Sequence, residues 1–357
     1  MLRGAFIGFG NVAANGHLPG WQARDDVTMI AATDVLSRRR DAFLQACPDG
    51  RWYQSVDDLL SNEPLDFVDI CAPPSSHAAL ITRALDAGLH VLCEKPLVTR
   101  LDDARSLAPT SARAGRVVHS VHNWLKAPIC KKVTALIDAA AIGRTRSIRW
   151  QTVRTGPAAA LGPEGSANWR IEPELAGGGI LLDHGWHALY CIMRWAGAPR
   201  RIAAVLNNRR FHEWPLEDTA RLALVLNSGT ADIYLTWAGD ERSNCIEIDG
   251  EHGHITVAND RVTLRLNSEE RHWTCPPSLA EGSHHPDWFT CVADDFLAAV
   301  LSGGRGNLDE AISCAELIDL AQQSSAAGGV SLPTGGSAAS AARLLDPAGA
   351  QLETPEQ

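Results

Sequence analysis

A glutamate and a lysine end a short apolar run in the stretch HVLCEKP at residues 90–96. The apolar residues predict a buried strand, and Pro96 must end it because proline has no N–H to donate to a neighbouring strand. If this strand belongs to an open parallel sheet, Glu94 and Lys95 lie at its carboxyl end, where such sheets bind ligands. Lys95 is therefore the first residue to consider for chemistry.

A second pair of reactive side chains, Asp183 and His187, follows three glycines in the stretch GGGILLDHGWH at residues 177–187. Apolar residues recur at helical spacing from 180 to about 195, so two side chains four positions apart share a helical face. A carboxylate beside an imidazole can orient it and raise its basicity. The alternative is a capping aspartate and a core histidine. His184 could add a metal ligand, but neighbouring residues point about 100° apart on a helix, so we expect no metal.

The elements that position Lys95 begin at the N-terminus. A short apolar strand at 5–7 leads into GFGNVA at 8–13, which matches G-x-G-x-x-A, and a helix-like stretch continues to about Arg24. A strand before this motif and a helix after it are the context in which it binds a pyrophosphate. Gly8 permits the tight turn, Gly10 lets the backbone approach the phosphates, and the helix N-terminus favours the anion.

Asp34 follows the second predicted strand, at 27–33, and lies 21 residues after Ala13. A carboxylate at about this spacing binds the ribose hydroxyls of NAD in dinucleotide-binding folds. It would repel the 2′-phosphate of NADP, although Arg38 and Arg39 in the next helix could partly reverse that preference. The alternative for Asp34 is an ordinary helix cap.

Strands and helices continue to alternate in the first third of the chain, which predicts a parallel sheet with right-handed crossovers. After a strand at 67–72, Ser75 or Ser76 can cap a helix that runs through Ala87. The strand at 89–93, a helix at 101–113 and a strand at 116–121 complete the pattern.

The second half of the chain has successive strands without intervening helices, which predicts an antiparallel sheet. These strands lie at 201–208, 219–227, 230–237, 244–250, 253–258, 261–266 and 271–275. The fold class is therefore α/β, with an N-terminal Rossmann parallel sheet and a C-terminal α+β domain that has a large, mostly antiparallel, open-faced sheet. The predicted domains are 1–122 and 123–334, followed by a poorly ordered tail at 335–357.

Composition excludes several classes of protein. The 357 residues carry a formal net charge of −10, which argues against nucleic acid or an anionic membrane as a partner. No apolar run approaches the ~20 residues of a membrane span, and the N-terminus lacks a signal-peptide core. Nine cysteines without a C-x-x-C motif indicate reduced thiols. We expect a soluble cytoplasmic protein.

These motifs occur in one order, and together they resemble a known family. The glycine motif, Asp34, PPSSH at 73–77 and AGLHVLCEKP at 87–96 resemble the glucose–fructose oxidoreductase/inositol dehydrogenase family, called Gfo/Idh/MocA. The stretch at 177–187 resembles the family signature GGGxLxDxGxH, whose Asp and His are substrate-site residues. The resemblance implies a hydride transfer between NAD(P) and a secondary alcohol or ketone of a sugar, sugar derivative or cyclitol.

The resemblance also allows two other functions. One is a lyase or hydrolase that retains NAD and oxidises a sugar transiently. The other is a non-catalytic NAD-binding regulator, which is disfavoured because Lys95, Asp183 and His187 are all present. We expect NAD as the cofactor, with NADP allowed by Arg38 and Arg39.

We expect His187 to act as the general base, Asp183 to hold the imidazole of His187, and Lys95 to bind the substrate oxygen as a cation. Cofactor-binding residues are expected at Gly8, Phe9, Gly10, Asn11, Val12, Asp34, Ala72, Pro73, Pro74, His77, Glu94 and Lys95. Substrate-binding residues are expected at Lys95, Asn123, Trp124, Trp169, Arg170, Asp183 and His187. His284 and His285 precede a helix at 287–301 and are interpreted as a solvated loop; the alternative is that they reach the substrate or a neighbouring subunit. A homodimer or homotetramer is expected to form through the open sheet.

Overall fold

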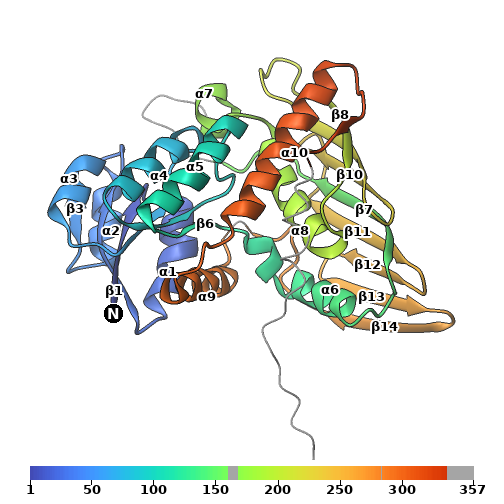
Figure 1. The fold of residues 1–357 in the computed structure, drawn as a ribbon, viewed down its shortest axis with the longest axis horizontal. Coiled ribbons are helices and arrows are strands. Elements are labelled where there is room, and N and C mark those ends of the chain that lie inside the picture. The colour runs from blue at the N-terminus through green and yellow to red at the C-terminus, as the bar shows by residue number, and fades with distance from the viewer. Residues whose placement is uncertain (160–167, 283, 336–357) are drawn as a thin grey trace, which may run out of the picture.

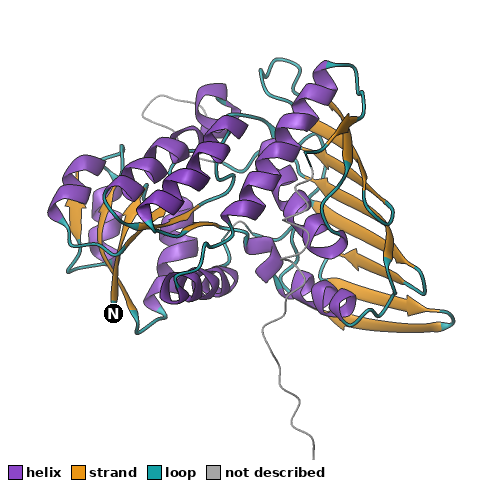
Figure 2. Ribbon diagram, viewed as in Figure 1, coloured by secondary structure: helices purple, strands orange, loops and turns teal. Residues whose placement is uncertain are grey.

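The computed structural model describes residues 1–159, 168–282 and 284–335, so the predicted tail lies almost wholly outside the described residues. Two β-sheets occupy opposite ends of the molecule, and helices fill the space between them (Figures 1 and 2). The helices in that space are α6 (Pro128–Asp138), α8 (Trp186–Ala196) and α10 (Leu308–Ala326). Residues of both halves line a cavity between them.

The first sheet has six strands in the order β3-β2-β1-β4-β5-β6, and every strand pair is parallel. Its strands are β1 (Leu2–Ile7), β2 (Val27–Thr33), β3 (Arg51–Tyr53), β4 (Phe67–Ile70), β5 (His90–Cys93) and β6 (Val118–Ser120). The order reverses between β1 and β4, which creates the crevice where doubly wound sheets bind nucleotides. The predicted Rossmann sheet is confirmed.

Both faces of this sheet are buried, as alternate residues of β1 demonstrate. Ala5 and Ile7 pack on one face against α3 (Val56–Asn62), α4 (His77–Asp86) and α5 (Leu101–Ala114). Phe6 packs on the other face against α1 (Leu18–Gln22) and α2 (Arg39–Ala46). Strands of this kind need apolar residues on both faces, which explains their continuous apolar runs.

Two elements of this half escaped the sequence analysis, strand β3 and helix α3. The three residues of β3 are too few to show a period, and the strand exists because it pairs with β2. Helix α3 did carry a signal, since the Ser55 side chain accepts a hydrogen bond from the Asp58 N–H at 3.1 Å. Ser76 occupies the N-cap position of α4, as predicted, but its hydroxyl donates to the Pro73 carbonyl and makes no capping hydrogen bond.

The second sheet has nine strands in the order β14-β13-β12-β11-β7-β10-β9-β8-β15, and only β7 and β10 pair in parallel. Its strands are β7 (Thr145–Val153), β8 (Arg201–Asn207), β9 (Thr219–Val225), β10 (Thr230–Thr236), β11 (Ser243–Gly250), β12 (His254–Ala258), β13 (Arg261–Leu266), β14 (Glu269–Thr274) and β15 (Leu332–Pro333). The helices between the two halves cover one face, and the other face forms the outer side of the molecule (Figure 2). The predicted mostly antiparallel sheet is confirmed.

Helix α9 (Pro286–Ser302) comes late in the chain but packs on the first sheet (Figure 1). Its apolar residues Phe289, Val292 and Phe296 share a core with Phe6 and Trp21 of the N-terminal half. The last third of the chain therefore helps to shape the nucleotide-binding half.

Two expectations from composition can be compared with the fold. The described helices include none with the length and apolar character needed to cross a membrane. All nine cysteines are unpaired.

Candidate active site

Lys95 lies two residues after the end of β5, at the carboxyl edge of the first sheet, and reaches across to the second half. Its Nζ donates to Asp183 Oδ1 at 2.9 Å and to the Asp183 carbonyl at 2.8 Å. Burial alone would raise the pKa of Asp183, but the Lys95 ammonium and the hydrogen-bonding contact with His184 outweigh it and hold that pKa well below its usual range. Asp183 is therefore ionised, and the pair joins the two halves of the molecule.

The carboxylate of Asp183 does not hold His187, contrary to the expectation from their spacing. Its second oxygen, Oδ2, lies 3.1 Å from Nδ1 of His184 instead. The reason is local, because residues Leu181–Gly185 form the π-helical turn η5 and the regular α-helix α8 begins only at Trp186. Such turns shift side chains off the faces that α-helical spacing predicts, and they often occur at functional sites.

Tyr190 holds His187, since its hydroxyl lies 2.6 Å from Nδ1 of the imidazole. The same hydroxyl accepts the Trp124 main-chain N–H at 3.0 Å, and the Trp124 ring stacks on His187 at 4.3 Å. Burial, together with Lys95 and His184, holds the pKa of His187 well below its usual range. The imidazole is therefore neutral, as a general base must be. When Nδ1 carries the proton and donates to Tyr190, Nε2 is the nitrogen that can accept one.

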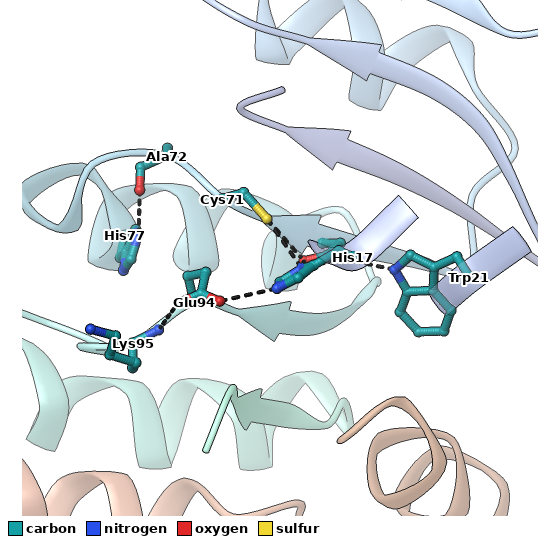
Figure 3. Close-up of polar contacts among 8 residues, drawn as sticks. His17, Trp21, Cys71, Ala72, His77, Glu94 and Lys95 are labelled. Atoms are coloured by element: carbon teal, nitrogen blue, oxygen red, sulfur yellow. Dashed lines mark hydrogen bonds and ion pairs between the residues drawn. The ribbon is translucent and has the colours of Figure 1, made fainter. Parts of the chain in front are cut away.

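Glu94 connects Lys95 to the core of the first sheet (Figure 3). Its Oε2 accepts the main-chain N–H of Lys95 at 3.0 Å, and its Oε1 lies 3.0 Å from Nε2 of His17. His17 ends the π-helical turn η1 (Ala13–His17) and is buried. The sequence analysis missed this histidine, although its place on the first turns after the glycine motif was a usable signal.

His17, Asp69 and Cys71 also offer ligand atoms within 4.8 Å of one another, a spacing that could hold a metal ion. Hydrogen bonds already explain why these ligand atoms lie so close together. Nδ1 of His17 lies 3.0 Å from Asp69 Oδ2, and the Trp21 indole N–H donates to the same oxygen at 2.8 Å.

The glycine motif leaves room for a pyrophosphate. Gly8 has a φ of +89°, and a Cβ there would lie 2.8 Å from the main chain of Ala72. A Cβ on Gly10 would meet nothing within 4 Å, so the backbone there faces open space. Asn11 is exposed and Val12 lines the cavity beside Lys95, whereas the Phe9 ring belongs to the core and only its N–H faces Asp34.

Asp34 lies at the end of β2 and its carboxylate closes the loop around the glycine motif. Its oxygens accept the main-chain N–H of Phe9 and of Leu36, both at 2.8 Å, and each retains a lone pair. Nε of Arg39 is buried and has no acceptor among the described residues. Gly8, Gly10, Asp34, Arg39, Ala72 and Pro73 line one cavity. These residues fit the adenosine half of a dinucleotide.

A second cavity adjoins the first and contains the predicted catalytic residues. It is lined by Lys95, Asp183 and His187, by Glu94 and Pro74, and by the predicted substrate residues Asn123, Trp124, Trp169 and Arg170. Cys71, Ala72 and Trp169 line both cavities, so a dinucleotide can extend from one into the other. The predicted residue His77 is instead fully buried, with its ring nitrogens 2.8 Å from the Ala72 carbonyl and 2.9 Å from the Pro96 carbonyl.

The second cavity also has walls that the sequence analysis did not assign. His284 and His285, interpreted as a solvated loop, line it, and His285 stacks on Trp288 at 3.6 Å. Arg154 follows β7, is only 2% exposed, and donates to the carbonyls of Ser243 and Leu279. Burial lowers the pKa of Arg154 to about 10, so it remains a cation at neutral pH.

Comparison with known proteins covers both halves of the chain. The family described as "Oxidoreductase family, NAD-binding Rossmann fold" matches residues 2–122, and the "GFO/IDH/MocA C-terminal domain" matches residues 130–256. The D-apiose dehydrogenase of Paraburkholderia graminis is 30% identical over 292 residues, which are 79% of this chain and 75% of that protein.

Two solved structures have the same fold. Levoglucosan dehydrogenase in complex with NADH and levoglucosan has a TM-score of 0.82 at 19% identity, over 94% of this chain and 100% of that one. An oxidoreductase from Agrobacterium radiobacter, in complex with NAD+, L-tartaric acid and magnesium, has a TM-score of 0.81 at 21% identity, over 93% and 98% of the two chains.

The family matches agree with the site. Gly8, Gly10 and Asp34 line a cavity, and Lys95, Asp183 and His187 line the cavity beside it. The chain belongs to the Gfo/Idh/MocA family of oxidoreductases and is an NAD(P)-dependent dehydrogenase whose NAD-binding domain is a Rossmann fold.

Proposed function

We propose that this enzyme transfers a hydride between the nicotinamide and a secondary alcohol or ketone of a sugar, sugar derivative or cyclitol. One observation carries the proposal: Lys95 from the first sheet and His187 from helix α8 line the same cavity, next to the dinucleotide cavity. Bound NAD(P) supplies the hydride chemistry, so the protein must place the substrate and move one proton.

The substrate oxygen is bound between Lys95 and His187. Lys95 is cationic and only 15% exposed, so it stabilises negative charge that develops on that oxygen more effectively than in bulk water. Asp183 fixes the ammonium through two hydrogen bonds. His187 takes the hydroxyl proton on Nε2 during oxidation and returns it during reduction, while Tyr190 holds Nδ1.

The walls of the cavity suit a polyhydroxylated ring. Trp169 lines it with an apolar ring, whereas Asn123 and Arg170 offer hydrogen-bond donors. The names of the similar sugar dehydrogenases agree with such a substrate.

A panel of sugars, sugar derivatives and cyclitols with NAD and with NADP tests the proposal, with the reduced cofactor followed by its absorbance. We expect at least one member to reduce NAD steadily. Turnover of a sugar without net NADH would contradict the proposal and indicate an enzyme that retains its cofactor. No turnover of any member in either direction would also contradict it.

A further inference from the structure

His17 lies between the carboxylates of Asp69 and Glu94 at the wall of the cavity, and Figure 3 shows its contact with Glu94. Its Nδ1 is 3.0 Å from Oδ2 and 3.1 Å from Oδ1 of Asp69, and its Nε2 is 3.0 Å from Oε1 of Glu94. The His17 ring is 2% exposed and stacks on Phe289 at 3.9 Å. Both ring nitrogens are therefore occupied by acids in a site closed to solvent.

This geometry requires more than one proton on the ring or its partners. A neutral imidazole has a single N–H, so one of its two nitrogen–carboxylate contacts would bring lone pairs together. An imidazolium donates from both nitrogens and forms two charge-assisted hydrogen bonds. Burial would lower the pKa of His17, but Asp69 and Cys71 outweigh it and raise that pKa well above its ordinary value. His17 is therefore a buried cation.

The two carboxylates differ in their access to the cavity. Asp69 is fully buried, and its Oδ2 also accepts the Trp21 indole N–H, so Asp69 is an anchor in the core. Glu94 lines the cavity and keeps 15% of its side chain exposed. Its other oxygen accepts the Lys95 main-chain N–H. A chain of alternating charges thus runs from Asp69 through His17 and Glu94 to Lys95.

We propose that His17, anchored by Asp69, is a positioning residue that holds the Glu94 carboxylate, and through it Lys95, in the arrangement that binds the nicotinamide half of the cofactor and the substrate oxygen. The inference rests on the proposed function for its catalytic part, but its effect on cofactor binding does not depend on the substrate. A purely structural role would be to neutralise Asp69 and fill the core beside Phe289.

Two substitutions of His17 separate these roles. The amide nitrogen of asparagine can take the place of Nδ1, and that of glutamine can take the place of Nε2. His17→Asn therefore keeps a donor toward Asp69 and loses the one toward Glu94, whereas His17→Gln does the reverse. If His17 positions Glu94, His17→Gln is the better enzyme and the better NADH binder.

The expected results follow from this pairing. His17→Asn should lower kcat by about 100-fold, the cost of a displaced catalytic group, and should weaken NADH binding about tenfold, the effect of one lost hydrogen bond. On a logarithmic scale, the decreases in kcat and in NADH affinity caused by His17→Gln should be no more than about a third of those caused by His17→Asn. NADH affinity is measured by fluorescence titration, so it is obtained even if the panel yields no substrate. His17→Asn that equals or exceeds His17→Gln in both kcat and NADH affinity would overturn the proposal.

Controls distinguish positioning from loss of folding. His119→Gln changes another buried histidine of the same half, on β6, and should leave kcat and NADH affinity unchanged. If a His17 variant does not fold, Glu94→Gln removes the partner from the cavity side and should weaken NADH binding about tenfold. Unchanged NADH affinity in Glu94→Gln would overturn the proposal as well.

The pH dependence gives a third readout. The groups facing His17 are Asp69 on β4, Cys71 directly after β4, Glu94 after β5, and His284 before α9. Because His17 holds Glu94 only while it is charged, wild-type NADH affinity should fall as pH rises through the raised pKa of His17. The affinity of His17→Gln should lack that decrease, and an identical pH profile in both proteins would overturn the proposal. If the wild type binds NADH but turns over no sugar, the proposed function fails. The NADH affinities of the His17 variants then still test this inference.

Discussion

Tyr190→Phe tests the correction that the structure makes to the sequence analysis, namely that Tyr190 rather than Asp183 orients His187. The substitution removes one oxygen and leaves the ring in place. That oxygen lies 2.6 Å from Nδ1 of His187 and 3.0 Å from the main-chain nitrogen of Trp124. Two buried polar groups therefore lose a partner at once.

The magnitude follows from these two bonds. A hydrogen bond between neutral groups contributes about 1 kcal/mol to stability, so the free energy of unfolding should fall by about 2 kcal/mol. An imidazole without its orienting partner should lower kcat/KM by about tenfold, which corresponds to about 1.4 kcal/mol of transition-state stabilisation. KM should change less than kcat, because Tyr190 contacts the base and not the substrate.

The assay compares steady-state kinetics and urea denaturation of the wild type and Tyr190→Phe at one pH. Tyr234→Phe is the matched control, since Tyr234 lies on β10 of the second sheet, away from the active-site cavity, and its hydroxyl accepts a hydrogen bond from Arg209. If Tyr190→Phe becomes less stable but keeps kcat/KM within about twofold of the wild type, the hydroxyl has only a structural role and the reasoning is refuted.

Three further predictions concern the cofactor, pH and assembly. Asp34→Asn should reduce the preference for NAD over NADP about fivefold in kcat/KM, because it removes a charge that repels the 2′-phosphate; an unchanged ratio would contradict this role. Burial lowers the pKa of His119 to about 3, so its contribution to stability is present above the unfolded pKa near 6.5 and is lost as pH falls toward 3. In His119→Gln, the urea concentration at the unfolding midpoint should decrease less between about pH 6 and pH 4 than in the wild type. Identical pH curves for the two proteins would contradict this role of His119. The open face of the second sheet, where Val205 is 49% exposed, should form a homodimer or homotetramer that Val205→Asp weakens; light scattering that finds a wild-type monomer would contradict this expectation.

Local sequence signals predicted the parts of the site that depend on one strand or one turn. Lys95 at a strand end, the glycine turn at Gly8 and the carboxylate of Asp34 follow from apolar runs, special backbone geometry and spacing. Strands β8 to β14 of the second sheet were also predictable, because turn residues separate alternating segments, whereas β7 and β15 were not predicted.

The remaining parts of the site depend on contacts between distant segments. The meeting of His17 with Asp69 requires η1 to fold over the end of β4, and no local pattern encodes that contact. Spacing placed Asp183 beside His187, but a π-helical turn intervenes and Tyr190 takes the position. His284 lines the cavity because α9 packs on the first sheet. Such contacts can be identified only when the tertiary structure is known.

The most direct test of the central claim is the effect of Lys95→Ala on NADH formation with a sugar or polyol that the wild type oxidises. Lys95 is placed to bind the reacting oxygen, and its loss should lower kcat/KM by at least about 100-fold while NADH binds and the protein stays folded. A Lys95→Ala enzyme with nearly wild-type kcat/KM would contradict the assignment of this cavity as the site of hydride transfer.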